Sequence, residues 1–248
     1  MSSTPWIIAH RGASGHYPEN SLISFLGAVE LGATCVEMDI QPTSDKQLVL
    51  FHDRTLERIC GITQMIPEMT LNEVRQLDVG LWKDSKWEGT RIPQLVDVLD
   101  KLPRSMNLNL ELKYHSSHDS WFERSVIDIA MEYELPKRGY IAIKHVDKIP
   151  LLKNIAPECP LGLLQKQRTP QESLDLCCKF DLPIVQIRKS AISNEWIEKF
   201  QDNGIKVNYF FSDNSNEMVT LFKNYNLDGI LTNYPDRGVK ALQQLNLI

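Results

Sequence analysis

Short apolar runs recur along the whole chain, and amphipathic stretches separate them. In two of these stretches, residues 22–29 and 95–102, apolar side chains fall at positions i, i+3, i+4 and i+7, which places one apolar stripe along a helix. Further helices are predicted over residues 121–133, 150–155, 171–180, 194–203, 216–225 and 238–245. The apolar runs predict eight strands, over residues 6–9, 35–40, 107–112, 140–143, 161–164, 184–187, 207–211 and 229–231.

Strands that alternate with helices pair in parallel through crossover connections. Eight such units in a chain of 248 residues predict a closed (β/α)8 TIM barrel of the α/β class, in which residues 1–248 form a single domain. The alternative is an open doubly wound sheet, which is expected to carry a glycine-rich phosphate loop after an early strand. The stretch Gly12-Ala13-Ser14-Gly15 matches neither the GxGxxG nor the Walker pattern, so we favour the barrel.

Residues 54–92 interrupt this alternation, because they contain several Gly and Pro residues and no strong strand pattern. One short helix is predicted there, since Thr70-Leu71-Asn72-Glu73 has the pattern of a capping box. A long excursion in a compact domain is usually a lid, a binding loop or a small inserted subdomain. We therefore predict a small insertion at about residues 54–92, after the second strand region, with a surface loop without a role as the alternative.

The composition is that of a globular protein with a large core, because 42% of the residues are apolar and 24% are charged. With 27 basic and 32 acidic residues the net charge is −5, and no basic block occurs. This balance argues against a nucleic-acid partner, which needs a positive footprint. An anionic small molecule is still compatible, since a local cluster or a metal can set the field within one cleft.

The start of the chain and its cysteines bear on the compartment. Residues 1–10 lack the basic and apolar segments of a signal peptide, and no apolar run approaches the roughly 18 residues of a membrane span. The five cysteines are odd in number and lack CxxC spacing, which indicates reduced, mostly buried thiols. We expect a cytoplasmic protein without stable membrane association.

Two apolar strands carry acidic residues on one face. Alternation places Glu37 and Asp39 together in the strand at 35–40, and Glu111 beside Lys113 in the strand at 107–112. Inward-facing carboxylates are costly to ionise without a cation or strong donors, and three of them suit Mg²⁺ or Ca²⁺. Either motif alone would indicate the solvated face of an edge strand, but their recurrence on two apolar strands favours a metal site.

Two histidines follow apolar strands. His10-Arg11-Gly12 ends the first strand, and His52-Asp53 follows the apolar residues 48–51. The carboxyl ends of the strands form the active face of a parallel barrel, and two imidazoles can serve both proton transfers of a phosphodiester cleavage. Arg11 offers a planar fork for phosphate oxygens. A lone histidine is more often structural, so the prediction depends on the pair.

Taken together, these segments resemble those of one known family. They run in order from residue 7 to about residue 236: His10-Arg11-Gly12, Pro18-Glu19-Asn20-Ser21, Glu37-x-Asp39, His52-Asp53-x-Thr55-Leu56, Ile92-Pro93-x-Leu95, Leu110-Glu111-Leu112-Lys113, Val207-Asn208-Tyr209-Phe210 and Asp228-Gly229-Ile230-Leu231-Thr232-Asn233-Tyr234-Pro235. In this order and spacing the chain resembles the glycerophosphodiester phosphodiesterases of the cytosolic bacterial type.

The resemblance implies a barrel with an inserted subdomain after the His-Asp step, which matches residues 54–92. It also implies one divalent cation, Mg²⁺ or Ca²⁺, held by Glu37, Asp39 and Glu111. His10 and His52 would be the catalytic acid–base pair, with His52 as the acid and His10 as the base.

Further residues gain roles from the same resemblance. Arg11 and Lys113 would hold the phosphate and stabilise its transition-state charge. Glu19 would brace the loop after the first strand, or the stretch 19–21 would cap a helix. The chain departs from the family where Phe210-Phe211 replaces a common Trp and a small polar residue, and where Asn233 replaces the usual Asp. The first departure bears on the alcohol pocket, and the second leaves the metal ligands intact.

The implied reaction is metal-dependent hydrolysis of a small-molecule glycerophosphodiester to glycerol 3-phosphate and an alcohol. One alternative is a lipid phosphodiesterase of the lysophospholipase D type on the same barrel, which should carry a membrane-binding amphipathic stretch. Another is a catalytically inactive barrel that acts as a binding protein, which should have lost some of the seven polar site residues. We find no such stretch, and all seven residues are present. The choice between Mg²⁺ and Ca²⁺, the attacking group (water or the substrate 2-hydroxyl), the alcohol, the oligomeric state and the roles of His115 and His118 stay open.

Overall fold

The computed structural model describes residues 4–115 and 120–248. Within these residues, eight parallel strands form one sheet, and β1 pairs with both β2 and β9, so the sheet closes into a barrel. The strands are β1 (Trp6–His10), β2 (Cys35–Pro42), β4 (Asn107–Leu112), β5 (Gly139–Ile143), β6 (Leu161–Leu164), β7 (Ile184–Arg188), β8 (Lys206–Phe210) and β9 (Gly229–Thr232). The predicted (β/α)8 barrel is confirmed.

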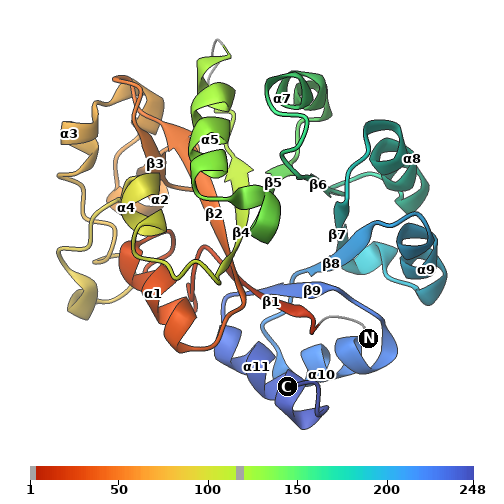
Figure 1. Ribbon diagram of the computed structural model, residues 1–248. Helices are drawn as coiled ribbons and strands as arrows, with labels where there is room; N and C mark the ends of the chain where they lie inside the picture. The colour runs from red at the N-terminus through yellow and green to blue at the C-terminus, as the bar shows by residue number, and fades with distance from the viewer. Residues whose placement is uncertain (1–3, 116–119) are drawn as a thin grey trace.

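Helices surround the barrel on its outer side (Figure 1). They are α1 (Leu22–Glu30), α4 (Leu95–Leu99), α5 (Trp121–Glu132), α6 (Leu135–Arg138), α7 (Ile149–Ile155), α8 (Pro170–Phe180), α9 (Asn194–Asp202), α10 (Ser215–Asn224) and α11 (Pro235–Gln244), with 3₁₀ turns η3 (Val146–Lys148) and η4 (Lys189–Ala191). Two predicted helix boundaries were wrong by more than one residue. The helix expected over 95–102 ends at Leu99, and the one expected from 238 begins at Pro235, where proline is favoured in the first turn.

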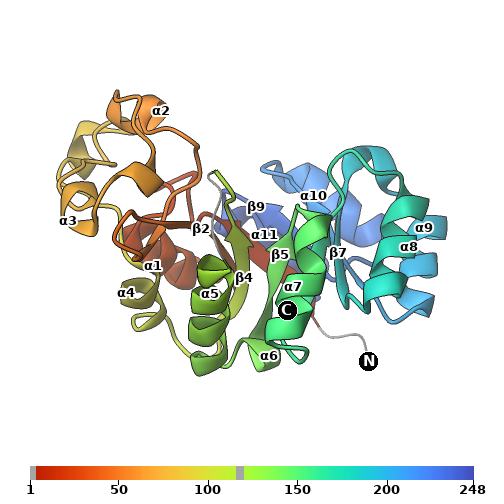
Figure 2. The ribbon, with the colours of Figure 1, turned by 90° about the horizontal axis from the view of Figure 1, so that it is seen from above.

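The segment after β2 leaves the barrel and returns. A short strand β3 (Leu48–Leu50) runs antiparallel to β2, and residues 54–92 then form α2 (Glu57–Cys60), η1 (Ile66–Glu68), α3 (Leu71–Val74) and η2 (Ser85–Trp87). The expectation of one short helix here was wrong, because α2 lacks the side-chain cap that announces α3. The segment has its own apolar cluster, which includes Phe51, Leu56 and Ile66, and it lies to one side of the barrel in Figure 2.

Alternation along the strands separates the core from the site. The outward side chains of β2 and β4 are buried against the helices: Val36, Met38, Ile40, Leu108, Leu110 and Leu112. The inward side chains include Glu37, Asp39 and Asn109, which are also buried. Parallel pairing sets Glu37 opposite Asn109 and Asp39 opposite Glu111, while β1 sets His10 opposite Glu37. The barrel closure therefore brings the polar ends of three strands together.

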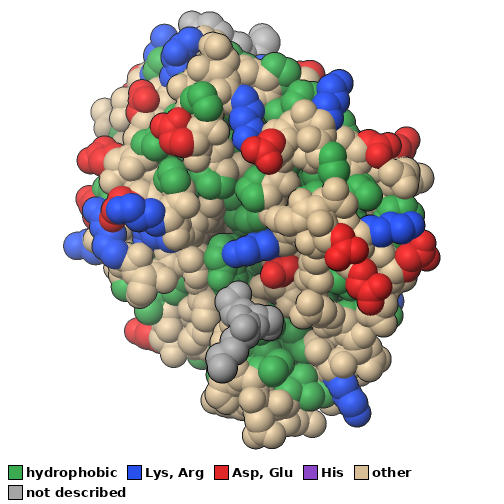
Figure 3. All heavy atoms as spheres, turned by 45° about the vertical axis from the view of Figure 1, so that its right-hand side comes forward, with side chains coloured by type: hydrophobic (Ala, Val, Ile, Leu, Met, Phe, Trp, Pro, Cys, Tyr) green, Lys and Arg blue, Asp and Glu red, His purple; other side chains and the backbone are tan. Residues whose placement is uncertain are grey.

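The surface carries charges of both signs. On the face shown in Figure 3, basic and acidic side chains are interspersed among hydrophobic and uncharged ones. All five cysteines are free, and Cys35, Cys159 and Cys177 are buried. Among the helices of residues 4–115 and 120–248, none combines the length and apolarity that a membrane crossing requires.

Candidate active site

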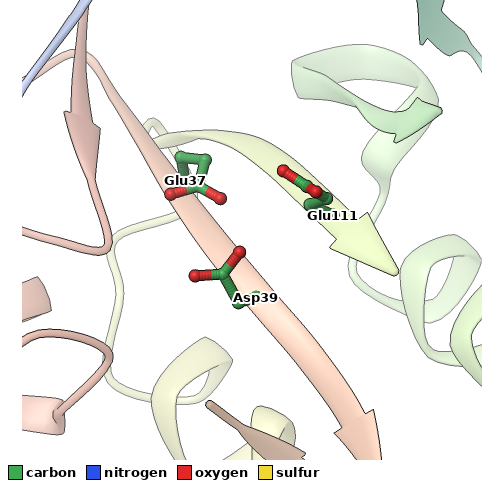
Figure 4. A group of neighbouring side chains, drawn as sticks. All are labelled: Glu37, Asp39 and Glu111. Atoms are coloured by element: carbon green, nitrogen blue, oxygen red, sulfur yellow. The ribbon is translucent and has the colours of Figure 1, made fainter. Parts of the chain in front are cut away.

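Three carboxylates converge on the inner side of β2 and β4 (Figure 4). Glu37 and Asp39 come from β2, Glu111 comes from β4, and their ligand oxygens all lie within 4.8 Å of one another. Glu37 and Asp39 are 3% and 1% exposed. Because β2 and β4 are neighbours in register, two motifs that lie about seventy residues apart in the sequence form a single acid cluster.

This acid cluster fits a hard divalent cation. Its donors are all carboxylate oxygens, which Mg²⁺ and Ca²⁺ prefer. Ligands on opposite sides of an ion lie about 4 Å apart around Mg²⁺ and about 5 Å apart around Ca²⁺, so oxygens within 4.8 Å of one another suit both ions. The spacing therefore supports a cation of this class without selecting one.

Two cationic side chains lie against the acid cluster. Lys113 Nζ donates to Asp39 and Glu111, at 2.8 and 2.6 Å. Arg11 Nε lies 3.3 Å from Asp39 Oδ2, and the backbone N–H of Arg11 donates to Glu37 at 2.8 Å. With all five side chains charged, three carboxylates and two cations give a formal charge of −1.

The surroundings treat the two buried acids differently. Burial alone raises the pKa of the Asp39 carboxyl, but the charges of Lys113 and Arg11 outweigh burial and hold this pKa well below its usual range. Burial also raises the pKa of Glu37, and the charges of Asp39 and Glu111 raise it further. A bound cation favours the ionised carboxylate, so cation binding and deprotonation of Glu37 are linked.

A tight turn after β1 positions Arg11. Arg11 and Gly12 have φ angles of 57° and 79°, in the region that favours glycine. A Cβ on Gly12 would lie 2.3 Å from Ser24 Oγ and 2.6 Å from the Ser24 backbone carbon, so no side chain fits there. Glu19 accepts a hydrogen bond from Arg11 Nη1 at 2.8 Å, which orients the guanidinium toward the acid cluster.

Residues 19–21 were expected either to brace the loop after β1 or to cap a helix, and different residues of this stretch make the two kinds of contact. Ser21 is the N-cap of α1, and its Oγ accepts from a backbone N–H of the first turn. Asn20 donates from Nδ2 to Asp39 Oδ2 at 2.8 Å. Glu19 contacts Arg11 and no carboxylate of the acid cluster. The brace and the helix cap are therefore separate residues of one turn.

The partners of His10 place its proton. Asn233 donates from Nδ2 to Asp213 Oδ2 at 2.9 Å, and because a carboxylate accepts, this bond fixes the orientation of the amide. Asn233 Oδ1 lies 2.9 Å from His10 Nδ1, so Nδ1 carries the hydrogen. Burial, together with the charge of Arg11, lowers the pKa of His10 to about 4. At neutral pH His10 is an uncharged imidazole whose Nε2 can accept a proton.

His52 has a partner of another kind. Its Nδ1 lies 2.7 Å from Asp53 Oδ1, and Arg58 Nε donates to Asp53 Oδ2 at 2.6 Å. Burial alone raises the pKa of Asp53, but the hydrogen bonds from Arg58 and His52 lower it, so Asp53 accepts and His52 Nδ1 donates. A carboxylate partner stabilises a positive ring more strongly than an amide partner does. The two histidines are thus suited to opposite proton transfers.

Arg58 connects the segment 54–92 to both sides of the site. Besides Asp53, it donates from Nη2 and Nη1 to Glu19, at 2.6 and 3.0 Å. Glu19 in turn holds Arg11, and the ring of Trp82 lies 5.3 Å from the Arg58 guanidinium. One side chain therefore orients the partner of a candidate catalytic histidine and the partner of a candidate phosphate ligand.

The site opens into a cleft of about 600 Å³, which is lined in part by His52, Glu111 and Lys113. His115 also lines this cleft, and its Nε2 lies 3.1 Å from the backbone oxygen of His52. That contact places His115 at the wall of the site. The other histidine of the HxxH pattern, His118, lies outside the described residues.

Two aromatic rings cover one side of His10. The centre of the Phe210 ring lies 6.3 Å from that of the imidazole, and the centre of the Phe211 ring lies 5.3 Å from it, both in edge contacts. These rings contribute to the burial that is the main cause of the low pKa of His10. The departure from the family pattern at these two positions therefore lies directly at the site.

Four residues that contact the site were not predicted from the sequence to do so: Asn20, Asp53, Arg58 and Asp213. Asn20 and Asp53 lie inside the quoted motifs, so adjacency to Glu19 and His52 was an available signal. Arg58 and Asp213 lie outside those motifs, and no pattern points to them.

A parallel barrel with three clustered carboxylates, two imidazoles and two cations at one end defines a candidate phosphodiester-cleaving site. The model of the "Glycerophosphoryl diester phosphodiesterase family" matches residues 10–237. The chain belongs to this family, which confirms the resemblance found in its motifs and the predicted enzyme class, a phosphodiesterase.

Relatives that match nearly end to end agree with this membership. The chain is 30% identical to a "glycerophosphodiester phosphodiesterase" of Caldanaerobacter subterraneus, over 96% of the chain and 98% of the relative. It is 28% identical to a "putative glycerophosphodiester phosphodiesterase" of Bacillus subtilis, over 98% and 100%. A solved structure of an Oleispira antarctica phosphodiesterase, in complex with the product sn-glycerol-3-phosphate, has a TM-score of 0.81 and 27% identity, with 97% of each chain covered.

The placement of the proton on His10 can be tested directly. Burial and the charge of Arg11 lower the pKa of His10 to about 4. We therefore expect Nε2 to stay unprotonated above about pH 5. Heteronuclear NMR of the imidazole nitrogens, assigned by comparison with His10→Gln, measures the pKa of His10 and shows which nitrogen carries the hydrogen. In Asn233→Asp the new carboxylate should raise the pKa of His10. A wild-type titration near the ordinary value of 6.5 would contradict the assignment.

Because Arg58 bridges Glu19 and Asp53, we expect its replacement by lysine to lower activity. A single ammonium cannot hold Glu19 and Asp53 together as the planar fork does. We expect Arg58→Lys to lower kcat/KM by about 10- to 100-fold, as changes to orienting partners do. Arg75→Lys, an exposed arginine of the same segment, is the matched control and should keep its activity. Equal rates for both variants would show that Arg58 does not position the site.

Proposed function

We propose that the chain hydrolyses glycerophosphodiesters to glycerol 3-phosphate and an alcohol, using a divalent cation and two histidines. The convergence of Glu37, Asp39 and Glu111 within 4.8 Å carries this proposal. The Oleispira relative, which was solved with sn-glycerol-3-phosphate as its product, supports the choice of product. The attacking oxygen is that of water, or that of the substrate's own 2-hydroxyl, in which case water then opens the resulting cyclic phosphate to give glycerol 3-phosphate.

Glu37, Asp39 and Glu111 would hold one Mg²⁺ or Ca²⁺ ion. When bound, such an ion acts as a Lewis acid on a phosphate oxygen and lowers the pKa of the attacking hydroxyl. The formal charge of the five side chains changes from −1 to +1 with a divalent ion. This sign is complementary to the single negative charge of a phosphodiester.

Arg11 and Lys113 are the proposed phosphate ligands. Both already lie at the acid cluster, with Arg11 Nε 3.3 Å and Lys113 Nζ 2.8 Å from Asp39. Lys113 is 9% exposed, and although burial lowers its pKa, the charges of Asp39 and Glu111 raise it more. Both side chains are therefore fixed cations, which can stabilise the charge that develops on the phosphoryl oxygens.

His10 is the proposed base and His52 the proposed acid. Nε2 of His10 takes the proton of the attacking oxygen, since that nitrogen carries a lone pair and its ring is uncharged. His52 gives a proton to the oxygen of the departing alcohol, and Asp53 orients its ring through Nδ1. The different partners of the two rings support a different role for each.

Removal of the cation or of its ligands tests this proposal. Treatment with a chelator should abolish turnover of glycerophosphocholine, and Mg²⁺ or Ca²⁺ should restore it. Asp39→Asn and Glu111→Gln should each lower kcat by about 10³-fold or more. Two ligands are compared because Asp39 neutralises both Lys113 and Arg11, whereas Glu111 pairs with Lys113 alone and is less buried.

Glu158→Gln, an exposed glutamate away from the cleft, serves as the control and should keep wild-type activity. Thermal unfolding by circular dichroism shows whether each variant is folded. Full turnover by the chelator-treated protein, or by the folded Asp39→Asn and Glu111→Gln variants, would refute the metal assignment. A comparison with lysophosphatidylcholine separates the proposed reaction from that of a lysophospholipase D.

A further inference from the structure

A second cleft, of about 570 Å³, adjoins the one that contains His52. The two clefts share Lys144 and Lys166 in their linings, so they lie side by side. Four basic residues that follow or end β5, β6 and β7 line the second cleft: Lys144, Lys166, Arg168 and Arg188. We call these four residues the basic groove.

Positive charge is in excess in the basic groove, where four cations face one carboxylate, that of Glu172. Within residues 4–115 and 120–248, none of its four cations forms an ion pair with an acidic side chain. The acidic residue that lines the second cleft, Glu172, accepts from the N–H and hydroxyl of Thr169 at 2.7 and 2.9 Å as part of the cap of α8. In a chain of net charge −5, this concentration of positive charge is local.

The two arginines of the basic groove are held in place by uncharged partners. Arg168 Nη1 donates to the backbone oxygen of Leu164, and Arg188 Nη1 to that of Lys166, both at 3.3 Å. Such bonds orient a guanidinium but leave its charge available. Lys166 is half-buried, with a φ of 53°, and its Nζ lies 5.8 Å from the centre of the Phe210 ring. The basic groove therefore extends to the aromatic wall beside His10.

We propose that the basic groove binds an anionic group, such as a phosphate monoester, on the alcohol half of the substrate. Neighbouring like charges repel, and an anion placed among them offsets that cost. The groove adjoins the cleft that contains His52, the proposed acid, which is expected to meet the departing alcohol. A quaternary ammonium there would be repelled. This inference rests on the proposed function and adds the class of alcohol to it.

A matched pair of substrates tests the inference. Glycerophosphoglycerol and the same diester with a terminal phosphate on its alcohol glycerol differ only in the group that the basic groove would hold. With the wild-type protein and Mg²⁺, we expect kcat/KM to be about tenfold or more higher for the phosphorylated diester. This preference should shrink as ionic strength rises. Glycerophosphocholine should be the poorest of the three.

Variants of the basic groove locate the preference. Arg168 and Arg188 line the second cleft and not the first, so the double variant Arg168→Gln/Arg188→Gln changes the groove away from the acid cluster. It should lose about tenfold in kcat/KM for the phosphorylated diester and less than about threefold for the unphosphorylated one. Lys223→Gln, an exposed lysine near the end of α10, is the matched control and should change neither.

The outcomes are distinct. A preference for the phosphorylated diester that disappears in the double variant supports the inference. Equal kcat/KM for both diesters with the wild-type protein overturns it while leaving the proposed function intact. An equal loss for both diesters in the double variant also overturns it, because the arginines would then not distinguish the alcohols. Failure to hydrolyse any of the three substrates overturns the proposed function and the inference together.

Discussion

The burial of three carboxylates at one point inside the barrel is the constraint on which the rest of the site depends. Carboxylates within 4.8 Å of one another repel, and their removal from water adds a further cost. Lys113 and Arg11 offset part of this cost from opposite sides of Asp39, and Asn20 adds a neutral donor. With all five side chains charged, a formal charge of −1 remains, which a bound divalent cation would offset. Stability and chemistry therefore depend on the same contacts.

The same barrel end holds two imidazoles whose surroundings differ. His10 lies against an amide whose orientation is fixed by a carboxylate one step away, while His52 lies directly against a carboxylate. Burial and the charge of Arg11 keep His10 uncharged, whereas His52 has a carboxylate as its direct hydrogen-bond partner. Asn233, at the position where the family usually has Asp, is thus more consequential than the sequence indicated.

The sequence was most informative where periodicity decides the structure. Alternation in 35–40 and 107–112 was sufficient to place Glu37, Asp39 and Glu111 on inward faces, because side chains along a strand must alternate. The count of strand–helix units was sufficient for the closed barrel. These features depend on local geometry that repeats, and a single chain displays them without reference to any partner.

The contacts that escaped prediction join residues that no periodicity relates. Arg58 meets Glu19 across 39 positions and Asn233 meets His10 across 223, and each depends on how a loop folds back over the barrel end. The helix α2 escaped because it is short and lacks a capping side chain. Likewise, the basic groove gathers Lys144, Lys166 and Arg188 from three strand ends, which only the order of the strands brings together.

The position of a bound cation is the most direct measure of the central claim. Anomalous diffraction from a crystal of the protein grown with Mn²⁺, a hard cation that stands in for Mg²⁺ or Ca²⁺, would locate it. The account predicts one strong peak at bonding distance from the carboxylates of Glu37, Asp39 and Glu111. A crystal whose Mn²⁺ lies elsewhere, with these three side chains bonded only to Lys113 and Arg11, would contradict it.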